Sequence, residues 1–305
     1  MRIGDSTMSK INYNKNVAVV TGSSTGIGYE TSVMLARNGF LTYATMRNLN
    51  KSESIKSIAT QENLPIHIKQ LDVTDHISVK NAVEAISSET GRIDILVNNA
   101  GYGLNGAFED LAMDEIKAQY ETNLFGLIRT TQTVLPIMRS QKSGTIVNIS
   151  SGLGRFGFPG SSAYVSTKFA VEGLSESMSY ELEPFGIKVV LVEPGVIKTN
   201  FVDGMVIAKK SQDPKSPYSQ IIQKMVTVLE DMMKNGSTPD LVAKVVLNAV
   251  TSQNPSLRYL AGNDVEQWLG KRNTSDEEFY KMMKQNLIGQ STASHEIQQD
   301  NNQMG

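Results

Sequence analysis

Short apolar runs alternate with longer amphipathic stretches along this chain from Val17 onward. The runs are rich in β-branched residues and predict strands, whereas the stretches repeat their apolar positions at helical spacing and predict helices. Asn38–Gly39 marks the end of the first predicted helix. The predicted strands cover residues 17–20, 41–46, 66–73, 93–101, 144–151, 187–195 and 257–262.

The predicted helices fill the intervals between these strands. Strands that read as continuous apolar runs between helices are typical of a parallel sheet covered by helices on both faces. Because crossovers between parallel strands are right-handed, the pattern predicts a doubly wound α/β fold with a ligand crevice at the carboxyl ends of the strands. The first three predicted helices end near Gly39, Asn63 and Thr90, and the later ones cover residues 114–138, 162–185, 241–250 and 275–288.

One such domain accounts for residues 15–288, and neither an internal repeat nor a domain boundary interrupts it. Residues 1–14 and the polar residues 289–305 have little to bury and are expected to be flexible. Between residues 201 and 238, apolar pieces flank a polar, proline-containing stretch. We interpret this region as a small substrate lid over the crevice.

The composition argues against several classes of function. A hydrophobic fraction of 40% supports a sizeable core, and a net charge of −2 with scattered cations argues against a nucleic-acid partner. Because the chain has no cysteine, disulfides and thiol catalysis are impossible. The three histidines, His67, His76 and His295, fit no metal-ligand spacing, so no metal site is expected.

The chain carries neither a targeting nor a membrane signal. No stretch approaches the roughly 18–20 apolar residues of a membrane span. The polar N-terminus lacks the apolar segment of a signal peptide. We therefore expect a cytoplasmic protein with no membrane span.

A glycine-rich turn, TGSSTGIG at residues 21–28, connects the first strand to the first helix. Glycines let such a turn close and let backbone N–H groups approach a diphosphate, which rests against the positive N-terminus of the helix. The position directly after the first strand predicts a dinucleotide site. Its predicted contacts in the turn are Gly22, Ser24, Thr25, Gly26, Ile27 and Gly28.

The end of the second strand bears on the choice of dinucleotide. An NAD site places an acidic residue there to bind the ribose 2′-hydroxyl, but Thr45, Met46 and Arg47 include no acid. A guanidinium matches phosphate geometry, so Arg47 favours NADP(H) over NAD(H), with a solvated surface arginine as the alternative. Further predicted cofactor contacts follow the later strands and are Asp72, Val73, Asn99, Ala100, Gly101, Pro194, Gly195, Ile197 and Thr199.

Tyr164 and Lys168 share one face of a predicted helix at a spacing of four residues. A phenol has a pKa of about 10, and a neighbouring ammonium together with a positive nicotinamide ring would lower it. The same spacing recurs at Tyr280 and Lys284, but that pair follows no strand. Only the first pair has a serine, Ser151, thirteen residues upstream at the end of a strand, so only Tyr164 is predicted to reach the crevice.

These motifs resemble the short-chain dehydrogenase/reductase family, in the subgroup that carries TGxxxGxG and YxxxK. The resemblance covers about residues 15–200 and rests on TGSSTGIG, LDV, NNAG, the asparagine of ETNLFG, NISS, YVSTK and PGVIKT, in this order. It implies a Rossmann fold and hydride transfer between a nicotinamide cofactor and a carbonyl/alcohol pair. It also implies homodimers or homotetramers that form through helices 114–138 and 162–185.

Carried over residue by residue, the family's catalytic tetrad corresponds to Asn123, Ser151, Tyr164 and Lys168. The resemblance implies that Ser151 holds the substrate oxygen and that Tyr164 exchanges a proton with it. Lys168 would also hold the nicotinamide ribose, and Asn123 would support a water leading to Lys168. Ser150 is the neighbour most easily confused with Ser151, whose offset from the tyrosine matches the family.

The resemblance indicates the substrate only as a class. The stretches LTYATMRNLN, ETNLFG and LRYLAG are similar to family members that act on hydroxysteroids, retinoids and other lipophilic ketones. The physiological direction stays open, although Arg47 favours reduction if NADPH is the cellular partner. By analogy, an apolar pocket would be lined by residues that are equally core candidates, namely Gly103, Leu104, Phe156, Phe158, Met205 and Val206.

Two other functions fit parts of the pattern. Sugar-nucleotide epimerases and dehydratases keep YxxxK, but their turn is TGxxGxxG and their C-terminal domain is larger than the residues after 200 allow. A non-enzymatic NADP-binding regulator on the same fold would typically lose the tyrosine or the lysine, and here both are in place. Turnover of carbonyl compounds with NADPH distinguishes an oxidoreductase from a regulator, which shows cofactor affinity alone.

Overall fold

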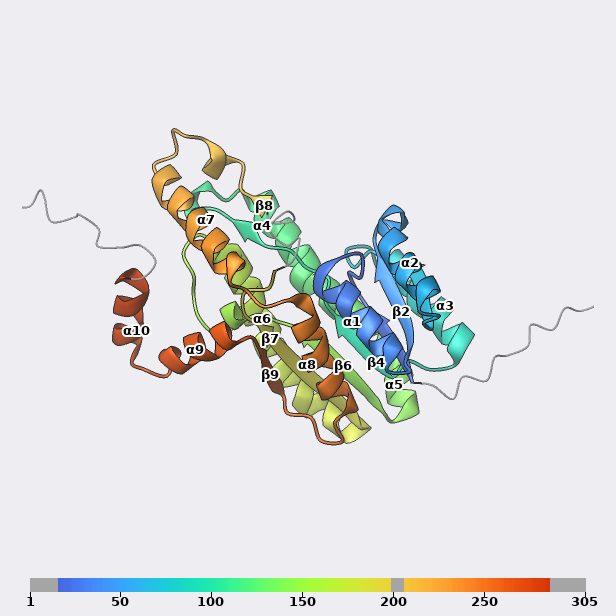
Figure 1. Ribbon diagram of the computed structural model, residues 1–305. Helices are drawn as coiled ribbons and strands as arrows, with labels where there is room; N and C mark the ends of the chain where they lie inside the picture. Colours follow the sequence, from blue (N-terminus) through green and yellow to red (C-terminus); the bar gives the residue numbers. More distant parts are fainter. Residues whose placement is uncertain (1–15, 199–205, 286–305) are drawn as a thin grey trace, which may run out of the picture.

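Parallel strands form the central layer of the molecule, and helices cover both of its faces (Figure 1). The computed structural model describes residues 16–198 and 206–285. Within these residues the sheet consists of β1 (Val17–Val20), β2 (Leu41–Met46), β3 (Ile66–Gln70), β4 (Ile95–Asn98), β6 (Gly144–Ile149), β7 (Ile187–Pro194) and β9 (Arg258–Ala261). Their order across the sheet is β3–β2–β1–β4–β6–β7–β9, and each neighbouring pair is parallel.

The helices of the described residues are α1 (Gly26–Arg37), α2 (Glu53–Gln61), α3 (His76–Thr90), α4 (Met113–Tyr120), α5 (Gly126–Gln141), α6 (Ser162–Leu182), α7 (Ser219–Lys234), α8 (Pro239–Thr251), α9 (Asn263–Arg272) and α10 (Asp276–Met283). Val17 and Val19 of β1 pack with α3 and α5 on one face. Ala18 and Val20 pack with α1 and α8 on the other, where these two helices lie side by side (Figure 1). Burial on both faces explains why the strands read as continuous apolar runs.

The direction of winding reverses in the middle of the sheet. From β1 the chain moves outward to β2 and β3 on one side, returns to β4 on the other side of β1, and continues outward to β6, β7 and β9. Connections that leave two neighbouring strands in opposite directions open a crevice at the carboxyl ends of those strands. The predicted doubly wound α/β fold is therefore confirmed.

Several elements differ from the predicted ones. The helix expected over residues 114–138 is longer, because α4 continues through a π-helical turn, Glu121–Phe125, into α5. The apolar pattern does not predict α9, which has only a few apolar positions and carries Gly270 in its last turn. Two short strands, β5 (Leu104–Asn105) and β8 (Val206–Ile207), also escape the pattern because two residues show no periodicity.

Residues 206–218 are bound to the segment that precedes α4 by strand pairing and by hydrogen bonds. β8 pairs in parallel with β5. The buried Asp110 accepts hydrogen bonds from Ser216 Oγ at 2.6 Å and from Ser211 Oγ at 3.2 Å. The hydrogen bond from Ser216 is the main reason why the pKa of the Asp110 carboxyl lies below its ordinary value. This part of the predicted lid is therefore anchored by a charged group in the interior.

No helix within the described residues is both long enough and apolar enough to cross a membrane. The terminal segments that the sequence predicts to be flexible, residues 1–14 and 289–305, lie outside the described part of the chain.

Candidate active site

A cavity of about 1040 Å³ opens at the carboxyl edge of the sheet, beside the point where the winding reverses. Segments that follow β1, β2, β3, β4, β6 and β7 form its wall, and α7 and α9 close it on one side. The predicted site residues on this wall are Gly22, Ser24, Thr25, Gly26, Ile27, Arg47, Asp72, Val73, Asn99, Ala100, Gly101, Ser151, Tyr164, Lys168, Pro194, Gly195 and Ile197.

Three predicted site residues are not on the wall. Gly28 and Asn123 lie behind it, and Thr199 lies outside the described residues. Of the residues predicted for the apolar pocket, Phe156, Phe158 and Val206 line the cavity, and Met205 lies outside the described residues. For Gly103 and Leu104, which the sequence leaves open between pocket and core, the structure does not support the pocket. Neither lines the cavity, and Leu104 is buried in a cluster with Leu111, Ala163 and Ala208.

The glycine turn after β1 is shaped by backbone conformations that other residues rarely adopt. Gly22 has φ +69° and Gly26 has φ +61°. A Cβ on Gly28 would lie 2.4 Å from both Asn99 Nδ2 and the Gly22 carbonyl oxygen. Asn99 Nδ2 in turn donates to the Thr21 carbonyl oxygen at 2.9 Å, so β4 holds the turn in place. Gly28 thus serves close packing of the turn instead of facing the cavity.

The N-terminus of α1 opens onto the cavity. Thr25 is the residue that precedes the helix, and its side chain makes no capping hydrogen bond. The first N–H groups of a helix have no partner within the helix, and together with the helix dipole they favour an anion. Thr25, Gly26 and Ile27 all line the cavity, so this end of the cavity offers N–H groups suited to a diphosphate.

Two cations follow β2 on the cavity wall. Arg47 is the predicted one, and its backbone carbonyl accepts a hydrogen bond from Gln70 Nε2 at 3.1 Å. Lys51 is the second, at the end of a short helical turn that Asn48 caps through a 3.0 Å bond from Asn50 N–H. Neither cation forms a salt bridge with a carboxylate of the described residues. Lys51 is missed by sequence reasoning, although an asparagine cap before a short turn is a signal that could have found it.

Tyr164, Ser151 and Lys168 meet on the cavity wall. Tyr164 and Lys168 lie one turn apart on α6, with Lys168 Nζ 5.6 Å from the centre of the tyrosine ring. Lys168 Nζ donates to the Ile149 carbonyl oxygen at 2.8 Å. Ser151 hydrogen-bonds with Tyr164 and accepts from Leu153 N–H at 3.1 Å. These contacts support the choice of Ser151 over Ser150 as the serine beside the phenol.

Burial dominates the titration of this group. Burial raises the pKa of Tyr164 to about 12, and the hydrogen bond with Ser151 opposes the rise. Burial lowers the pKa of Lys168 to about 8, and the nearby Glu172 carboxylate opposes the fall. The groups of the protein alone therefore do not lower the pKa of the phenol, because loss of hydration outweighs the hydrogen bond with Ser151.

Asn123 lies in the π-helical turn between α4 and α5, and its side chain is buried. Its Oδ1 accepts a hydrogen bond from Tyr102 N–H at 3.0 Å, and its Nδ2 donates to the Tyr102 carbonyl oxygen at 2.9 Å. The amide therefore fixes the segment that follows β4. Its role toward a water and Lys168 stays a prediction.

An ion-pair cluster lies behind Lys168 and joins three elements. Arg258 of β9 contacts Glu172 of α6 at 3.0 Å and Glu193 of β7 at 3.4 Å, while Arg155 contacts Glu193 at 3.2 Å. Burial, followed by the Glu172 charge, raises the pKa of Glu193 to about 7. The two carboxylates next to the site thus share the Arg258 cation.

The apolar end of the cavity comes largely from elements beyond the sequence motifs. Leu229, Met232 and Met233 of α7 and Trp268 of α9 line it. The Trp268 ring stacks on Phe156 with ring centres 5.9 Å apart. These residues were not predicted; the one signal for them in the sequence is that Trp268 is the only tryptophan of the chain.

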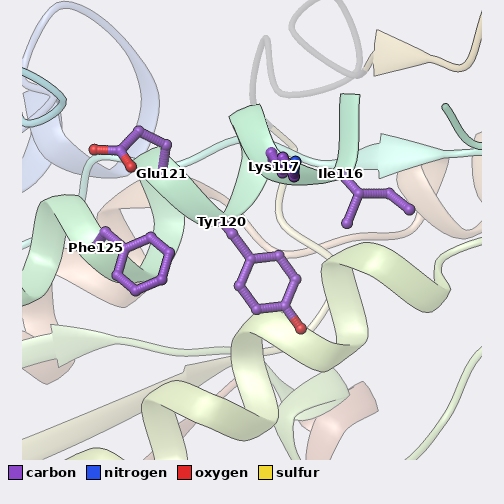
Figure 2. A pocket seen from close by; sticks show the side chains of 5 residues that line it. All are labelled: Ile116, Lys117, Tyr120, Glu121 and Phe125. Atoms are coloured by element: carbon purple, nitrogen blue, oxygen red, sulfur yellow. The ribbon is translucent and has the colours of Figure 1, made fainter. Parts of the chain in front are cut away.

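A second hollow, of about 450 Å³, lies on the outer side of α4. Figure 2 shows the side chains that line it, which are Ile116, Lys117, Tyr120, Glu121 and Phe125. It contains none of the predicted site residues. Among the described residues there is also no group of histidine and acidic side chains that could hold a metal ion. The cavity at the sheet edge is therefore the candidate active site.

Comparison with known proteins identifies the family. Residues 16–210 match the family model described as short chain dehydrogenase. The chain belongs to the short-chain dehydrogenase/reductase family. As a member of this family it is an NAD(P)-dependent oxidoreductase, and the expected resemblance is confirmed.

Several curated dehydrogenases and reductases are similar to this chain. An uncharacterised oxidoreductase of Bacillus subtilis, YusZ, is 39% identical over 83% of this chain and 91% of its own length. The 3-ketodihydrosphingosine reductase of Bacteroides thetaiotaomicron is 37% identical over 81% of this chain and 87% of its length. Human retinol dehydrogenase 8 is 34% identical over 79% of each chain.

Solved structures share the fold. A Streptomyces avermitilis enzyme superposes with a TM-score of 0.78 at 29% identity, covering 91% of this chain and 98% of its own. ElxO, solved with NADP bound, superposes with a TM-score of 0.68 at 30% identity, covering 81% of this chain and 97% of its own.

Replacing Gly28 by alanine is expected to weaken cofactor binding at least about tenfold and to lower the free energy of unfolding by about 1–3 kcal/mol, because its Cβ would overlap Asn99 and the Gly22 carbonyl. Fluorescence titration with NADPH and urea unfolding measure the two effects. Gly173→Ala is the control, since Gly173 lies exposed in α6 with nothing near its Cβ; it should stabilise by about 0.5–1 kcal/mol. Wild-type binding by the Gly28 variant would contradict the packing role.

Proposed function

We propose that this short-chain dehydrogenase interconverts lipophilic ketones or aldehydes and their alcohols with NADP(H), using Tyr164 as the acid/base. The single observation that carries the proposal is that Tyr164, Ser151 and Lys168 lie on the wall of one cavity. The same wall includes the glycine-rich turn at the N-terminus of α1 and the apolar side chains of α7 and α9. A cofactor at the glycine-rich turn and a hydrophobic carbonyl compound at the apolar side chains would meet at the phenol.

Each catalytic side chain has a distinct task in this proposal. When bound, a nicotinamide cofactor supplies or accepts the hydride at the carbonyl carbon. The Ser151 hydroxyl holds the substrate oxygen, and Tyr164 donates its proton to that oxygen in reduction and takes it back in oxidation. A pKa of about 12 keeps the phenol protonated, which is the form that donates the proton in reduction. The Lys168 ammonium, one turn away, stabilises the phenolate as it forms.

The residues of the polar end fit a phosphorylated dinucleotide. The uncapped N-terminus of α1 offers N–H groups to the diphosphate. Arg47 and Lys51 on the wall after β2 would pair with a 2′-phosphate, and no acidic residue stands at the end of β2 to bind a ribose hydroxyl. The NADP-bound structure of ElxO, which is 30% identical, adds support for NADP(H) over NAD(H).

The apolar end favours a lipophilic substrate. Aromatic and flexible apolar side chains, including Phe156, Met232 and Trp268, line it, and such walls bind hydrophobic groups by excluding water. Two relatives, named as a 3-ketodihydrosphingosine reductase and a retinol dehydrogenase, also point to lipid-like substrates. In this proposal, residues 201–238 act as the lid over that end.

We also infer assembly into a homodimer or homotetramer through α4–α5 and α6, as the family resemblance implies. Exposed aromatic side chains on these helices, Phe125 and Phe169, support this inference.

Tyr164→Phe is expected to lower turnover by about 10²–10⁴-fold, because the proton donor is lost, while NADPH affinity stays within about twofold of wild type. The loss of NADPH absorbance with ketones of graded size measures turnover. Tyr280→Phe is the matched control, since Tyr280 repeats the YxxxK spacing on α10 but is exposed, and this variant should keep wild-type rates. Near wild-type turnover by Tyr164→Phe would end the assignment, and a wild-type protein that binds NADPH without turnover would indicate the regulator alternative.

Arg47→Ala and Lys51→Ala are each expected to raise KM for NADPH about tenfold and to leave KM for NADH unchanged, because each removes a charge-assisted bond to the 2′-phosphate. Steady-state kinetics with both cofactors measure the ratio. Arg139→Ala removes an exposed arginine from the last turn of α5 and should change neither value. An equal rise for NADH and NADPH would exclude recognition of the 2′-phosphate.

The value of kcat/KM for NADPH should fall as the pH rises through about 8, because this parameter reports groups of the free enzyme and Lys168 loses its proton there. Tyr164, with a pKa of about 12, stays protonated over the same range. Initial rates at saturating ketone give the profile. A constant value up to about pH 10 would show that the charge of Lys168 is not required.

A further inference from the structure

α9 begins beyond residue 210, where the match to the family model ends, yet it delivers side chains to the active site. Asp264, Val265 and Trp268 on this helix line the cavity. Asp264 is the charged member of the three, and none of the sequence motifs assigns it a task.

The Asp264 carboxylate binds the segment that follows β7. Its Oδ2 accepts a hydrogen bond from the Val196 N–H at 2.6 Å. A hydrogen bond of this length to an ionised acceptor is at the strong end of the range for N–H donors. Val196 lies between Gly195 and Ile197, and all three residues line the cavity. The carboxylate therefore binds the backbone of a neighbouring part of the cavity wall.

Two glycines make room for this carboxylate. A Cβ on Gly195, after β7, would lie 2.2 Å from Asp264 Oδ1, and a Cβ on Gly262, after β9, would lie 2.5 Å from the same oxygen. Gly262 also has φ +132°, a conformation that side chains rarely adopt. Two neighbouring strands thus end in glycines around one carboxylate, which indicates a built contact between β7, β9 and α9.

The same segment is held on its other side by backbone bonds alone. Gly195 N–H donates to the Ala261 carbonyl oxygen at 3.0 Å, and Val196 accepts from Ser237 N–H at 2.9 Å. Lys198 N–H donates to the Ser237 carbonyl oxygen at 2.7 Å. The hydrogen bond from Val196 N–H to Asp264 adds a side-chain contact to these backbone bonds. Replacing Asp264 would take this partner from the Val196 N–H and would leave the backbone bonds in place.

We propose that Asp264 is a positioning residue that holds the Gly195–Ile197 wall in the conformation that receives the nicotinamide ring. The wall is close to the catalytic group, since a Cβ on Gly152, directly after Ser151, would lie 3.7 Å from the Pro194 carbonyl oxygen. The inference rests on the proposed function, because it needs a nicotinamide at this end of the cavity. Asp264 acts on the reaction only through the backbone of Val196.

Position on the helix sets this carboxylate apart from an ordinary cap. Gly262 precedes the helix, and Asp264 is its second residue, with a side chain directed to the neighbouring strand end. The positive N-terminus of α9 favours an ionised carboxylate in the first turn. Glu266 also lies in that turn, but it is exposed and is not on the cavity wall, so it provides a matched control.

The test compares two ligands that share the adenine end. NADP⁺ carries a nicotinamide, and 2′,5′-ADP does not. Asp264→Ala is expected to weaken binding of NADP⁺ about tenfold, to leave the affinity for 2′,5′-ADP within about twofold, and to lower kcat about 10–100-fold, because a small displacement of the ring spoils alignment for hydride transfer. Asp264→Asn keeps the shape and should lose less, and Glu266→Ala should change none of the three values.

Equal losses for both ligands in Asp264→Ala and Asp264→Asn would overturn the proposal, since they would indicate general damage to the fold; unchanged values for both variants would overturn it as well. If Asp264→Ala does not fold, the Asp264→Asn ratio decides alone. The failure of the proposed function looks different. A wild-type protein that binds NADP⁺ but turns over no carbonyl compound would refute the oxidoreductase chemistry, and the ratio of the two affinities would still decide the role of Asp264.

Discussion

Parallel pairing forces the segments that follow the strands of this sheet to leave it along one edge. The glycine turn after β1, the cations after β2, Ser151 after β6 and the Gly195 wall after β7 are far apart in sequence, and the sheet brings them to one cavity. β1, β2 and β4 are buried along their whole length, so their register is strongly constrained by packing. The packing of the sheet therefore determines where the active-site segments lie relative to one another.

Charged groups have different surroundings at the polar end of that cavity and at its catalytic centre. At the polar end the backbone N–H groups of α1 and the side chains of Arg47 and Lys51 face the cavity. At the catalytic centre, burial pushes the pKa of the phenol up and that of the ammonium down, which leaves both near their neutral forms at moderately alkaline pH. A cofactor that brings positive charge to this centre would favour the phenolate, so the state of Tyr164 depends on what is bound beside it.

The sequence was sufficient for the fold and for most of the wall. The signals for these parts can be recognised in the sequence alone. They are glycines, an asparagine and a serine at strand ends, and a tyrosine–lysine pair at helical spacing. Lys51, Asp264 and Trp268 lie on short or weakly periodic elements whose placement depends on tertiary packing. The sequence left Leu104 open between pocket and core, because an apolar residue beside a cavity and one in the core look alike in a sequence, and the structure places it in the core. The direction of the Tyr164 pKa shift depends on burial, which spacing does not report.

The two ends of the α7 region are both tied down, by Asp110 to Ser216 on one side and by Ser237 to Val196 and Lys198 on the other. Separating Ser216 from Asp110 would leave a buried carboxylate without this hydrogen bond, which costs free energy. Between these two attachments, Met232 and Met233 of α7 line the apolar end of the cavity. Methionine side chains are unbranched and polarisable. They can therefore adapt to ligands of different shapes, while the backbone that holds the catalytic residues keeps its position.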